Sequence, residues 1–350
     1  MIVAFRVDAS EGMGSGHVMR CIALAEALQE RQHEVIFICV ELEGNLIDKL
    51  KGLAFEVWPL KSSSHYQCAQ GWDWQLDAED TLALVERHQK AFDWLCVDHY
   101  QLDARWERIL GGCGARIAVI DDLADRWHAC DVLVDQNAIE ANHLRYNNLV
   151  PASCLKLLGP RYTLLRKEFS DVSEQRRECS DVLGTNGSIL VFLGGADSGN
   201  YTLRLLQNID LQHLAFPLHV LIGPMNPWKN DVIEWCRKQD VAFTVAHDRI
   251  GDLLKYTRAA VVACGMFAVE LQALEVPCAL IPLSDIQATV AHYFASQGRA
   301  IVVEPTVLSD PNQVLDTFTK LLALPYLSTG AGVVPVDGAR QVICHLESYV

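Results

Sequence analysis

An apolar run, a glycine-rich loop and an amphipathic helical pattern follow one another at the start of this sequence. Residues 2–7 are apolar enough for a central parallel strand, and apolar residues recur at the helical period over residues 18–28. The loop between them contains Gly12, Gly14 and Gly16, which allow positive φ angles and a close approach of a ligand to the backbone. Open α/β sheets begin with such units and bind ligands at the carboxyl ends of their strands. The segment therefore predicts an α/β fold with a ligand site at this loop.

The loop ends in His17, in the first turn of the expected helix. The unpaired N–H groups and the positive dipole end of that helix favour a phosphorylated or anionic ligand. Histidine side chains ordinarily titrate near neutral pH, which suits a catalytic acid or base. A plain glycine turn followed by a surface histidine is the alternative, since neither feature is specific alone. We expect Gly14 and Gly16 to contact the substrate and His17 to act on it.

Strand-like and helix-like runs alternate along the rest of the chain. In the first half, strands are expected at residues 2–7, 34–40, 54–58, 93–98, 116–120, 132–135 and 155–158, and helices near 18–31, 77–90 and 103–111. In the second half, strands are expected at residues 189–193, 219–222, 242–245, 261–263, 279–282 and 301–303. This order predicts an α/β protein with two doubly wound, Rossmann-like domains.

A polar passage separates the two halves. Residues 170–187 are charged and rich in turn-forming residues, as is typical of a domain boundary. We expect an N-terminal domain over residues 1–168, a linker over 169–187 and a C-terminal domain over 188–336. A helix within residues 337–350 is expected to pack back on the first domain, and the two domains are expected to meet at a cleft.

Composition limits the classes of function. A formal net charge of −15 disfavours nucleic acid and anionic membrane surfaces as partners. No apolar run is long enough to span a membrane, and the first residues lack the features of a signal peptide, so a cytoplasmic location is expected. The 12 cysteines are scattered without a C-x-x-C pair and are expected to be reduced thiols of the core. A single nucleotide could still bind through backbone amides.

A second glycine loop follows an apolar run in the other half of the chain. It contains Gly194 and Gly195, followed by Asp197 and Asn200. Taken alone, this string is better explained as a tight turn in which Asp197 or Ser198 caps the next helix.

A third strand-to-helix turn lies farther along the chain. Residues 261–263 lead through Gly265 into a helix that contains Glu270. A carboxylate offers two acceptor oxygens, which suit two neighbouring hydroxyl groups. A solvent-facing helix glutamate is the alternative.

Polar side chains also follow the strands of the first half. They are Asp8, Asp98, Tyr100, Asp122, Asp135 and Asn137. Because the carboxyl ends of parallel strands lie at one edge of a sheet, these side chains could surround a substrate near His17. In the alternative, the acids satisfy loop amides and orient one another, and Asp8 and Asp122 are the candidates for that support role. A divalent metal held by these acids and His99 is disfavoured, because no His-x-x-x-His or Asp-x-Asp spacing provides a dedicated site.

These strings resemble those of a known family. Residues 6–10 read R-x-D-A-S, and a short glycine loop, Gly16-His17 and Arg20-Cys21 follow. This order is similar to the amino-terminal signature of the nucleotide-sugar hydrolases of pseudaminic acid biosynthesis, the UDP-2,4-diacetamido-2,4,6-trideoxy-β-L-altropyranose hydrolase family. The G-G-x-D-x-x-N string of that family is matched at Gly194, Gly195, Asp197 and Asn200. More distantly, the first segment looks like the opening element of the lipid-II-forming GlcNAc transferases.

The resemblance implies a two-domain fold of the GT-B type and a metal-independent reaction without a cofactor. The implied reaction is hydrolysis of a UDP-linked 2,4-diacetamido-2,4,6-trideoxy-L-altrose to free sugar and UDP, by attack of water at the anomeric carbon. His17 would be the general base. The implied catalytic residues are His17, Asp8, Asp98 and Tyr100. The implied substrate-binding residues are Gly14, Gly16, Arg20, Asp122, Asn137, Gly194, Gly195, Asp197, Asn200, Gly265, Glu270 and Gln287, with Glu270 on the ribose hydroxyls of UDP.

The sequence departs from this pattern at four positions. Cys264, Met266 and Phe267 stand where relatives often have Ser, Gly or Thr, and Ile286 stands where an asparagine is common. Ile286 cannot supply the hydrogen bonds of that asparagine, although Gln287 beside it can contact a sugar. Two other functions therefore stay open, a soluble glycosyltransferase with a UDP-sugar donor and a catalytically silent nucleotide-sugar-binding protein. The oligomeric state stays open as well.

Overall fold

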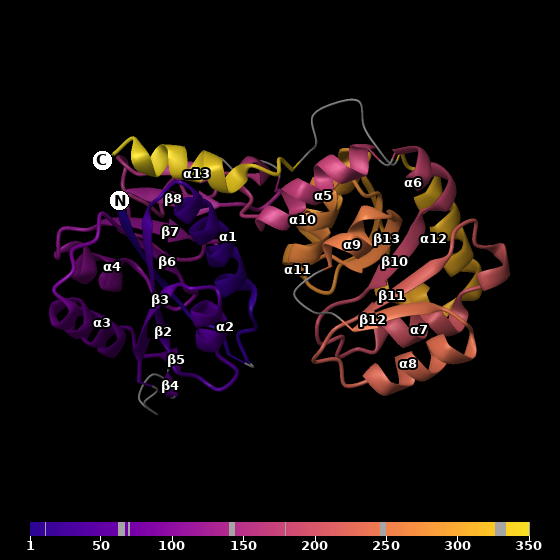
Figure 1. Cartoon of the computed structure of the whole chain (residues 1–350), viewed down its shortest axis with the longest axis horizontal. Coiled ribbons are helices and arrows are strands. Elements are labelled where there is room, and N and C mark those ends of the chain that lie inside the picture. Colours follow the sequence, from indigo (N-terminus) through magenta and orange to yellow (C-terminus); the bar gives the residue numbers. More distant parts are fainter. Residues whose placement is uncertain are drawn as a thin grey trace. The chain divides into compact units, whose positions relative to one another are not determined.

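Two compact α/β units make up the chain (Figure 1). Unit 1 comprises Met1–Asn137, Ala141–Lys167 and Asp337–Val350, and unit 2 comprises Ala138–Glu140 and Glu168–Val336. The computed structural model describes residues 1–10, 12–61, 67–68, 71–139, 144–178, 180–245, 250–325 and 334–349. Each unit is built on one parallel sheet, and the predicted fold class of two Rossmann-like α/β sheets is confirmed.

The sheet of unit 1 has seven strands in the order β3-β2-β1-β6-β7-β8-β9, and each adjacent pair is parallel. Its strands are β1 (Ile2–Val7), β2 (Glu34–Val40), β3 (Glu56–Leu60), β6 (Trp94–Asp98), β7 (Arg116–Ile120), β8 (Val132–Asp135) and β9 (Leu155–Leu158). The short strands β4 (Gln67–Cys68) and β5 (Gly71–Trp72) form a separate antiparallel pair. Because helices cover both faces of the parallel sheet, most of its strand residues are apolar and buried.

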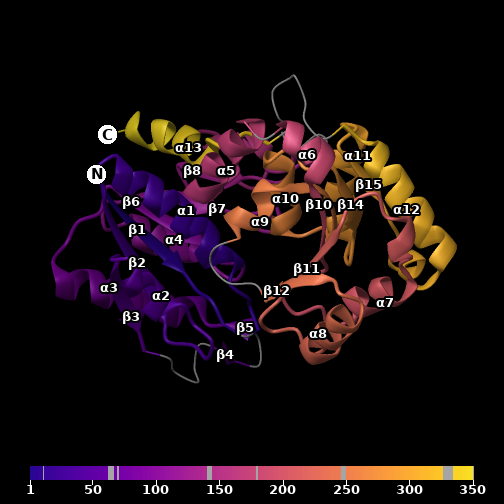
Figure 2. The same ribbon diagram turned by 45° about the vertical axis from the view of Figure 1, so that its right-hand side comes forward.

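Helices pack on both faces of this sheet (Figure 2). They are α1 (Gly16–Glu30), α2 (Ile47–Gly52), α3 (Trp74–His88), α4 (Ala104–Gly111) and α13 (Gly338–Glu347). Successive residues of a strand point to opposite faces. In β1, Val3, Phe5 and Val7 join the core under α1 and α13, whereas Ala4 joins the core under α3 and α4. This alternation decides which polar side chains meet at the ends of the strands.

The last helix, α13, belongs to the core of unit 1. Ile343 and Leu346 are fully buried, and the indole nitrogen of Trp94 in β6 donates a hydrogen bond of 3.2 Å to the carbonyl of Leu346. Helix α13 also packs along α1.

Unit 2 has a six-stranded parallel sheet in the order β12-β11-β10-β13-β14-β15. Its strands are β10 (Ser188–Phe192), β11 (Leu218–Ile222), β12 (Ala242–Val245), β13 (Thr257–Ala263), β14 (Cys278–Ile281) and β15 (Ala300–Val302). Its helices are α5 (Lys167–Glu178), α6 (Ser180–Asn186), α7 (Tyr201–Asn208), α8 (Lys229–Lys238), α9 (Gly251–Lys255), α10 (Met266–Ala273), α11 (Asp285–Ser296) and α12 (Pro311–Ala323). Short 3-10 turns lie at Pro160–Tyr162 in unit 1 and at Leu211–His213 and Pro305–Ser309 in unit 2. Side chains of α7, α8 and α12 form one core with the sheet.

The polar passage expected to be a linker, residues 169–187, is helical over most of its described residues. It folds as most of α5 and as α6, and it groups with unit 2. Helix α5 buries Phe169 and Val172, and the guanidinium of Arg176 donates hydrogen bonds to the carbonyls of Leu254 and Leu274. Burial lowers the pKa of Arg176 to about 10. Hydrogen bonds from Arg176 to carbonyls of other elements therefore help to hold α5 in place. The few apolar residues of this segment did not predict a packed helix.

The cysteines and the apolar content of the helices can be compared with the sequence predictions. The cysteines with described side chains are free and most are buried, but Cys113 and Cys344 are exposed, so the prediction of core thiols is wrong for these two. The side chains of Cys68 and Cys179 lie outside this description. None of the helices in the described part of the chain has the length and apolar content that a membrane crossing requires.

We predict that Leu346→Ala lowers the free energy of unfolding by about 2 to 5 kcal/mol, because it leaves a cavity in the core of unit 1. Denaturation by urea measures the change. Leu53→Ala is the matched control, because Leu53 also belongs to unit 1 but is 40% exposed. A loss no larger than that of the control would contradict a core role for α13.

Candidate active site

The loop between β1 and α1 is open on the side of its glycines. Gly14 has a φ of +77°, which favours glycine, and its N–H donates to the carbonyl of Ser10 at 2.8 Å. A Cβ atom built on Gly14 or Gly16 would meet no heavy atom within 4 Å. Helix α1 begins at Gly16, so its first N–H groups lie beside this free space. The loop thus offers room for a ligand next to His17.

His17 lies in the first turn of α1 and is held by a carboxylate. Its Nδ1 atom is 2.5 Å from Oδ1 of Asp98, the last residue of β6. Because a carboxylate only accepts hydrogen bonds, Nδ1 is the donor, and the neutral ring then has its lone pair on Nε2. Nε2 has no hydrogen-bond partner among the described residues. The histidine is only 6% exposed, so its orientation is fixed by packing and by this bond.

Asp98 is paired at the same time with Arg20, one turn farther along α1. Nε of Arg20 donates to Oδ2 at 2.6 Å, and an Nη atom donates to Oδ1 at 2.6 Å. Burial alone raises the pKa of Asp98, but the neighbouring Arg20 and then His17 outweigh it and hold that pKa well below its usual range. Asp98 is therefore ionised at neutral pH.

Arg20, predicted as a substrate-binding residue, is engaged within the protein. Its other Nη atom donates to Oδ2 of Asp122 at 2.8 Å, and its side chain is 5% exposed. Asp122, also predicted to bind substrate, follows β7 and is 20% exposed at its side chain. The structure thus brings His17, Arg20, Asp98 and Asp122 into one network. We call this network the histidine cluster.

Tyr100 completes the histidine cluster. Its ring lies edge-on against the imidazole of His17, with 4.4 Å between the ring centroids, and the residue is 40% exposed. Burial, and then the charge of Asp122 and a hydrogen bond to it, raise the pKa of Tyr100. Its phenol therefore stays protonated at neutral pH and covers one side of the histidine.

Asp8, predicted as a catalytic residue, belongs to a different cluster. Asp98 is in register with Val7, so its side chain shares the α1 face of the sheet, whereas Asp8 points to the α3 face. There Asp8 lies 2.8 Å from the guanidinium of Arg6 and accepts the N–H of Val40 at 2.7 Å. Asp8 is fully buried and is engaged by a guanidinium and a backbone amide of the protein itself.

The cluster around Asp8 consists of buried charges that pair with one another. Arg6 donates Nε to Asp77 of α3 at 3.1 Å, and the indole nitrogens of Trp72 and Trp106 donate to the same carboxylate at 3.0 and 2.8 Å. His99 faces Asp8 across 3.6 Å, and burial lowers its pKa to about 3, so it is neutral. We call these residues the arginine cluster.

Asn137 lies beside the backbone of Asp122. Its Nδ2 atom donates to the carbonyl of Asp122 at 3.2 Å, and its N–H donates to Asp135 at 2.9 Å. Burial raises the pKa of Asp135 to about 6, and Arg145 is bonded to this carboxylate. Arg145 is a residue that the sequence analysis missed, because no motif or strand end marks it.

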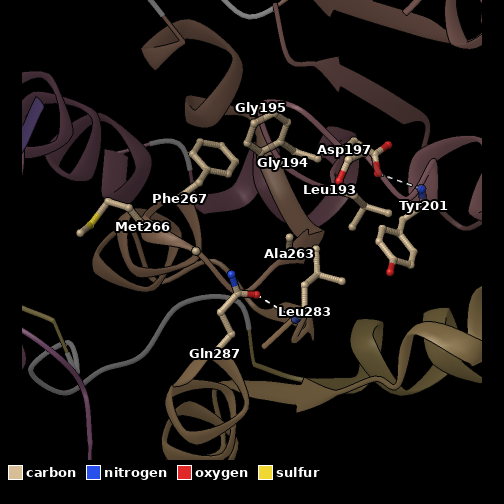
Figure 3. Close-up of a pocket in the computed structure, with 13 residues that line it drawn as sticks. Leu193, Gly194, Gly195, Asp197, Tyr201, Ala263, Met266, Phe267, Leu283 and Gln287 are labelled. Atoms are coloured by element: carbon tan, nitrogen blue, oxygen red, sulfur yellow. Dashed lines mark hydrogen bonds between the residues drawn. The ribbon is translucent and has the colours of Figure 1, made fainter. Parts of the chain in front are cut away.

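Unit 2 contains a pocket of about 270 Å³ at the carboxyl ends of β10 and β13 (Figure 3). Five predicted substrate-binding residues line it, namely Gly194, Gly195, Asp197, Gly265 and Gln287. Its apolar wall is formed by residues such as Phe192, Met266, Phe267 and Leu283, with the rings of Phe192 and Phe267 edge to face at 4.9 Å. The pocket is thus lined by the glycine loop and by apolar side chains.

The backbone of this pocket's glycine loop favours glycine at two positions, one in the loop and one beside it. Gly194 has a φ of +109°, and a Cβ atom on Gly223 would lie 1.9 Å from the carbonyl oxygen of Gly195. Asp197 caps α7 by accepting the N–H groups of Tyr201 at 2.8 Å and of Thr202 at 3.0 Å. The helix-cap alternative for Asp197 therefore fits the structure.

Asn200 and Glu270 do not line this pocket. Asn200 precedes α7 in the left-handed region, with a φ of +53°, and its Oδ1 atom is buried without a hydrogen-bond partner. Glu270 lies in α10, which Gly265 precedes as the N-cap, and it is partly buried. Among the departures from the family pattern, Met266 and Phe267 line the pocket, Cys264 is buried and Ile286 is 52% exposed.

Gln287 is oriented from within its own turn. Its Oε1 atom accepts the N–H of Leu283 at 2.9 Å, which leaves its amide NH₂ group for other contacts. Within the described ranges, no three His, Cys, Asp or Glu residues are grouped so that they could hold a metal ion.

Comparison with known proteins gives distant relatives. No family model matches the chain. It is 25% identical over 303 residues to the UDP-2,4-diacetamido-2,4,6-trideoxy-beta-L-altropyranose hydrolase of Campylobacter jejuni, covering 86% of this chain and 98% of the relative. It is 23% identical over 371 aligned positions to the spore coat polysaccharide biosynthesis protein SpsG of Bacillus subtilis, covering 99% and 100%. The chain is a distant homologue of both.

Solved structures share the whole fold. MurG of Acinetobacter baumannii aligns with a TM-score of 0.60 at 12% identity over 99% of both chains. S. aureus MnaA, in a structure with UDP, aligns with a TM-score of 0.62 at 11% identity over 99% of this chain and 96% of its own. The fold is therefore of the GT-B type.

We predict that Asp77→Ala lowers the free energy of unfolding by about 3 to 5 kcal/mol, because it leaves the buried charge of Arg6 short of a partner. Asp316→Ala is the control, because Asp316 is 58% exposed in an ion pair within one helix, and its removal should cost less than about 1 kcal/mol. Chemical denaturation compares the two. Equal and small effects would show that the arginine cluster does not stabilise unit 1.

Proposed function

We propose that the protein hydrolyses a UDP-linked sugar to the free sugar and UDP. The observation that carries this proposal is the pair of His17 and Asp98 beside an open glycine loop, with Nδ1 and Oδ1 2.5 Å apart. In this pair the carboxylate fixes the ring so that Nε2 can accept a proton from water. The 25% identity to a UDP-sugar hydrolase over almost the full length of that relative supports the same reaction.

In the proposed step, water attacks the anomeric carbon of the sugar. A bond forms between the water oxygen and that carbon, the bond from the carbon to the diphosphate oxygen breaks, and Nε2 of His17 takes the proton. UDP leaves with the electron pair of the broken bond. Because the diphosphate is a good leaving group, the protein mainly has to hold the water, accept its proton and stabilise charge. We assign Asp98 to hold His17, and Tyr100 to cover it.

We propose that UDP binds to unit 2, at the pocket formed by the glycine loop and the start of α10. The N-terminus of α10 and the backbone of Gly194 and Gly195 would accept the diphosphate. Glu270, one turn farther along α10, would accept the two ribose hydroxyls. Asn200 and Gln287 would donate their amide N–H groups to the substrate.

The proposed sugar is the 2,4-diacetamido-2,4,6-trideoxy-L-altrose of the relative, and the proposed setting is pseudaminic acid biosynthesis in the cytoplasm. The identity to that hydrolase supports this choice. Met266 and Phe267 make the pocket more apolar than hydroxyl side chains would. No metal or cofactor enters the proposed reaction.

We predict that His17→Asn lowers the rate of UDP release by about 10²- to 10⁴-fold, the range for loss of a general base. Binding of UDP, measured by calorimetry, should not change, because unit 2 holds the nucleotide in this proposal. Purified protein is incubated with the UDP-sugar in the absence of any acceptor, with and without EDTA. EDTA should have no effect.

The same experiment separates the alternatives. UDP release that requires an added sugar or lipid acceptor would indicate a glycosyltransferase, and UDP binding without any turnover would indicate a binding protein. A near-native rate in His17→Asn, or a rate that EDTA abolishes and Mg²⁺ restores, would contradict the role of His17.

We predict that Glu270→Ala weakens UDP binding by about 1 to 3 kcal/mol, because the ribose hydroxyls lose their acceptor. Calorimetry with UDP alone measures this change. Glu234→Ala, which removes an exposed glutamate of α8, is the control and should bind UDP as the wild type does. An unchanged affinity in Glu270→Ala would overturn the ribose assignment.

A further inference from the structure

We propose that Arg20 is a positioning residue that keeps His17 neutral, and so able to act as a base, by neutralising the carboxylate that orients it. This inference rests on the proposed function, in which His17 is the general base. It goes beyond that function because it proposes that Arg20 sets the pH range over which the reaction runs.

The geometry gives Arg20 no free face for a ligand. Two of its nitrogens bind the two oxygens of Asp98 at 2.6 Å each, and the third binds Asp122 at 2.8 Å. Arginine matches a carboxylate in this way because its guanidinium is a planar fork. The side chains of Arg20 and Asp98 are 5% and 1% exposed, so water screens the pair very little.

The charge balance around His17 explains why this pairing matters. A buried carboxylate in contact with an imidazole strongly favours the protonated ring, which cannot act as a base. The guanidinium adds a positive charge on the same carboxylate and also lies 3.2 Å from Nδ1 of His17, which disfavours the protonated ring. Asp98 can then orient the ring through its hydrogen bond without holding it in the charged form.

None of the other titratable groups near His17 supplies the positive charge of Arg20. Cys21 lies beside Arg20 in α1. Asp98, His99 and Tyr100 lie at the end of β6. Asp122 comes from the end of β7. In the described part of the chain, Cys21, His99 and Tyr100 are neutral at neutral pH, whereas Asp98 is ionised and Arg20 is charged. Arg20 is thus the cation that offsets the carboxylates.

The test measures UDP release by Arg20→Gln and Arg20→Lys from about pH 5 to about pH 9. In Arg20→Gln, the acid limb of the kcat/KM profile should move about 1 to 2 pH units upward, the scale of one neighbouring charge, and the rate should recover at alkaline pH. Arg20→Lys keeps the charge, so its acid limb should stay near that of the wild type. Asp98→Asn removes the negative charge and should move the limb in the opposite direction. Arg105→Gln changes an exposed arginine of α4 and should leave the profile unchanged.

A second measurement needs no turnover. Nuclear magnetic resonance titration of the histidine rings, with the His17 signal assigned by its loss in His17→Asn, should show that Arg20→Gln moves the His17 midpoint to higher pH. This readout stands even if the substrate is a different nucleotide sugar. It therefore separates failure of this inference from failure of the proposed function.

Three results with Arg20→Gln would contradict this role of Arg20. A rate in Arg20→Gln that falls by the same factor at every pH would mean that Arg20 only maintains the fold. If Arg20→Gln raises KM but leaves kcat and the acid limb of the pH profile unchanged, Arg20 binds substrate instead. An unmoved His17 titration would refute the charge argument directly.

Discussion

The negative charge of Asp98 is the constraint on which the arrangement of the candidate site depends. This carboxylate ends a buried strand and is 1% exposed, so water cannot solvate it. Its partners are therefore side chains of α1. Arg20 supplies the compensating charge and His17 supplies a further hydrogen bond, and both bonds require α1 to start at the glycine loop. One buried acid at the end of β6 thus holds the histidine and the arginine of the first turns of α1.

The pleat of the sheet keeps two sets of charges apart. Asp98 and Val7 share a register and a face, whereas Asp8 and His99 follow them in sequence and point to the opposite face. The histidine cluster consequently lies under α1, where the glycine loop is open. The arginine cluster lies under α3, where Arg6 and two indole groups donate hydrogen bonds to the carboxylate of Asp77. The histidine cluster lies beside the open glycine loop, and the arginine cluster joins α3 to the sheet.

Much of the fold could be predicted because buried parallel strands are continuous apolar runs. The strands at residues 34–40 and 116–120 have the predicted bounds. Helix α5 was not predictable in this way, because its packing depends on Arg176 binding carbonyls that are distant in sequence. Likewise, acidic residues that directly follow strands are predicted to lie at the carboxyl edge of the sheet. Their position in the sequence does not predict which side chains they bind. Because successive side chains of β1 and β6 point to opposite faces of the sheet, the sequence could have placed Asp8 and Asp98 on different faces. The contact of Arg145 with Asp135 has no corresponding signal in the sequence.

The central claim is that water, positioned by His17, attacks the anomeric carbon of a UDP-linked sugar. The most direct measurement runs the reaction without an acceptor in water labelled with heavy oxygen and analyses both products by mass spectrometry. The account predicts that one labelled oxygen appears in the free sugar and none in UDP. Label in the phosphate of UDP would place the attack at phosphorus, and the absence of free sugar would show that the protein does not hydrolyse this bond.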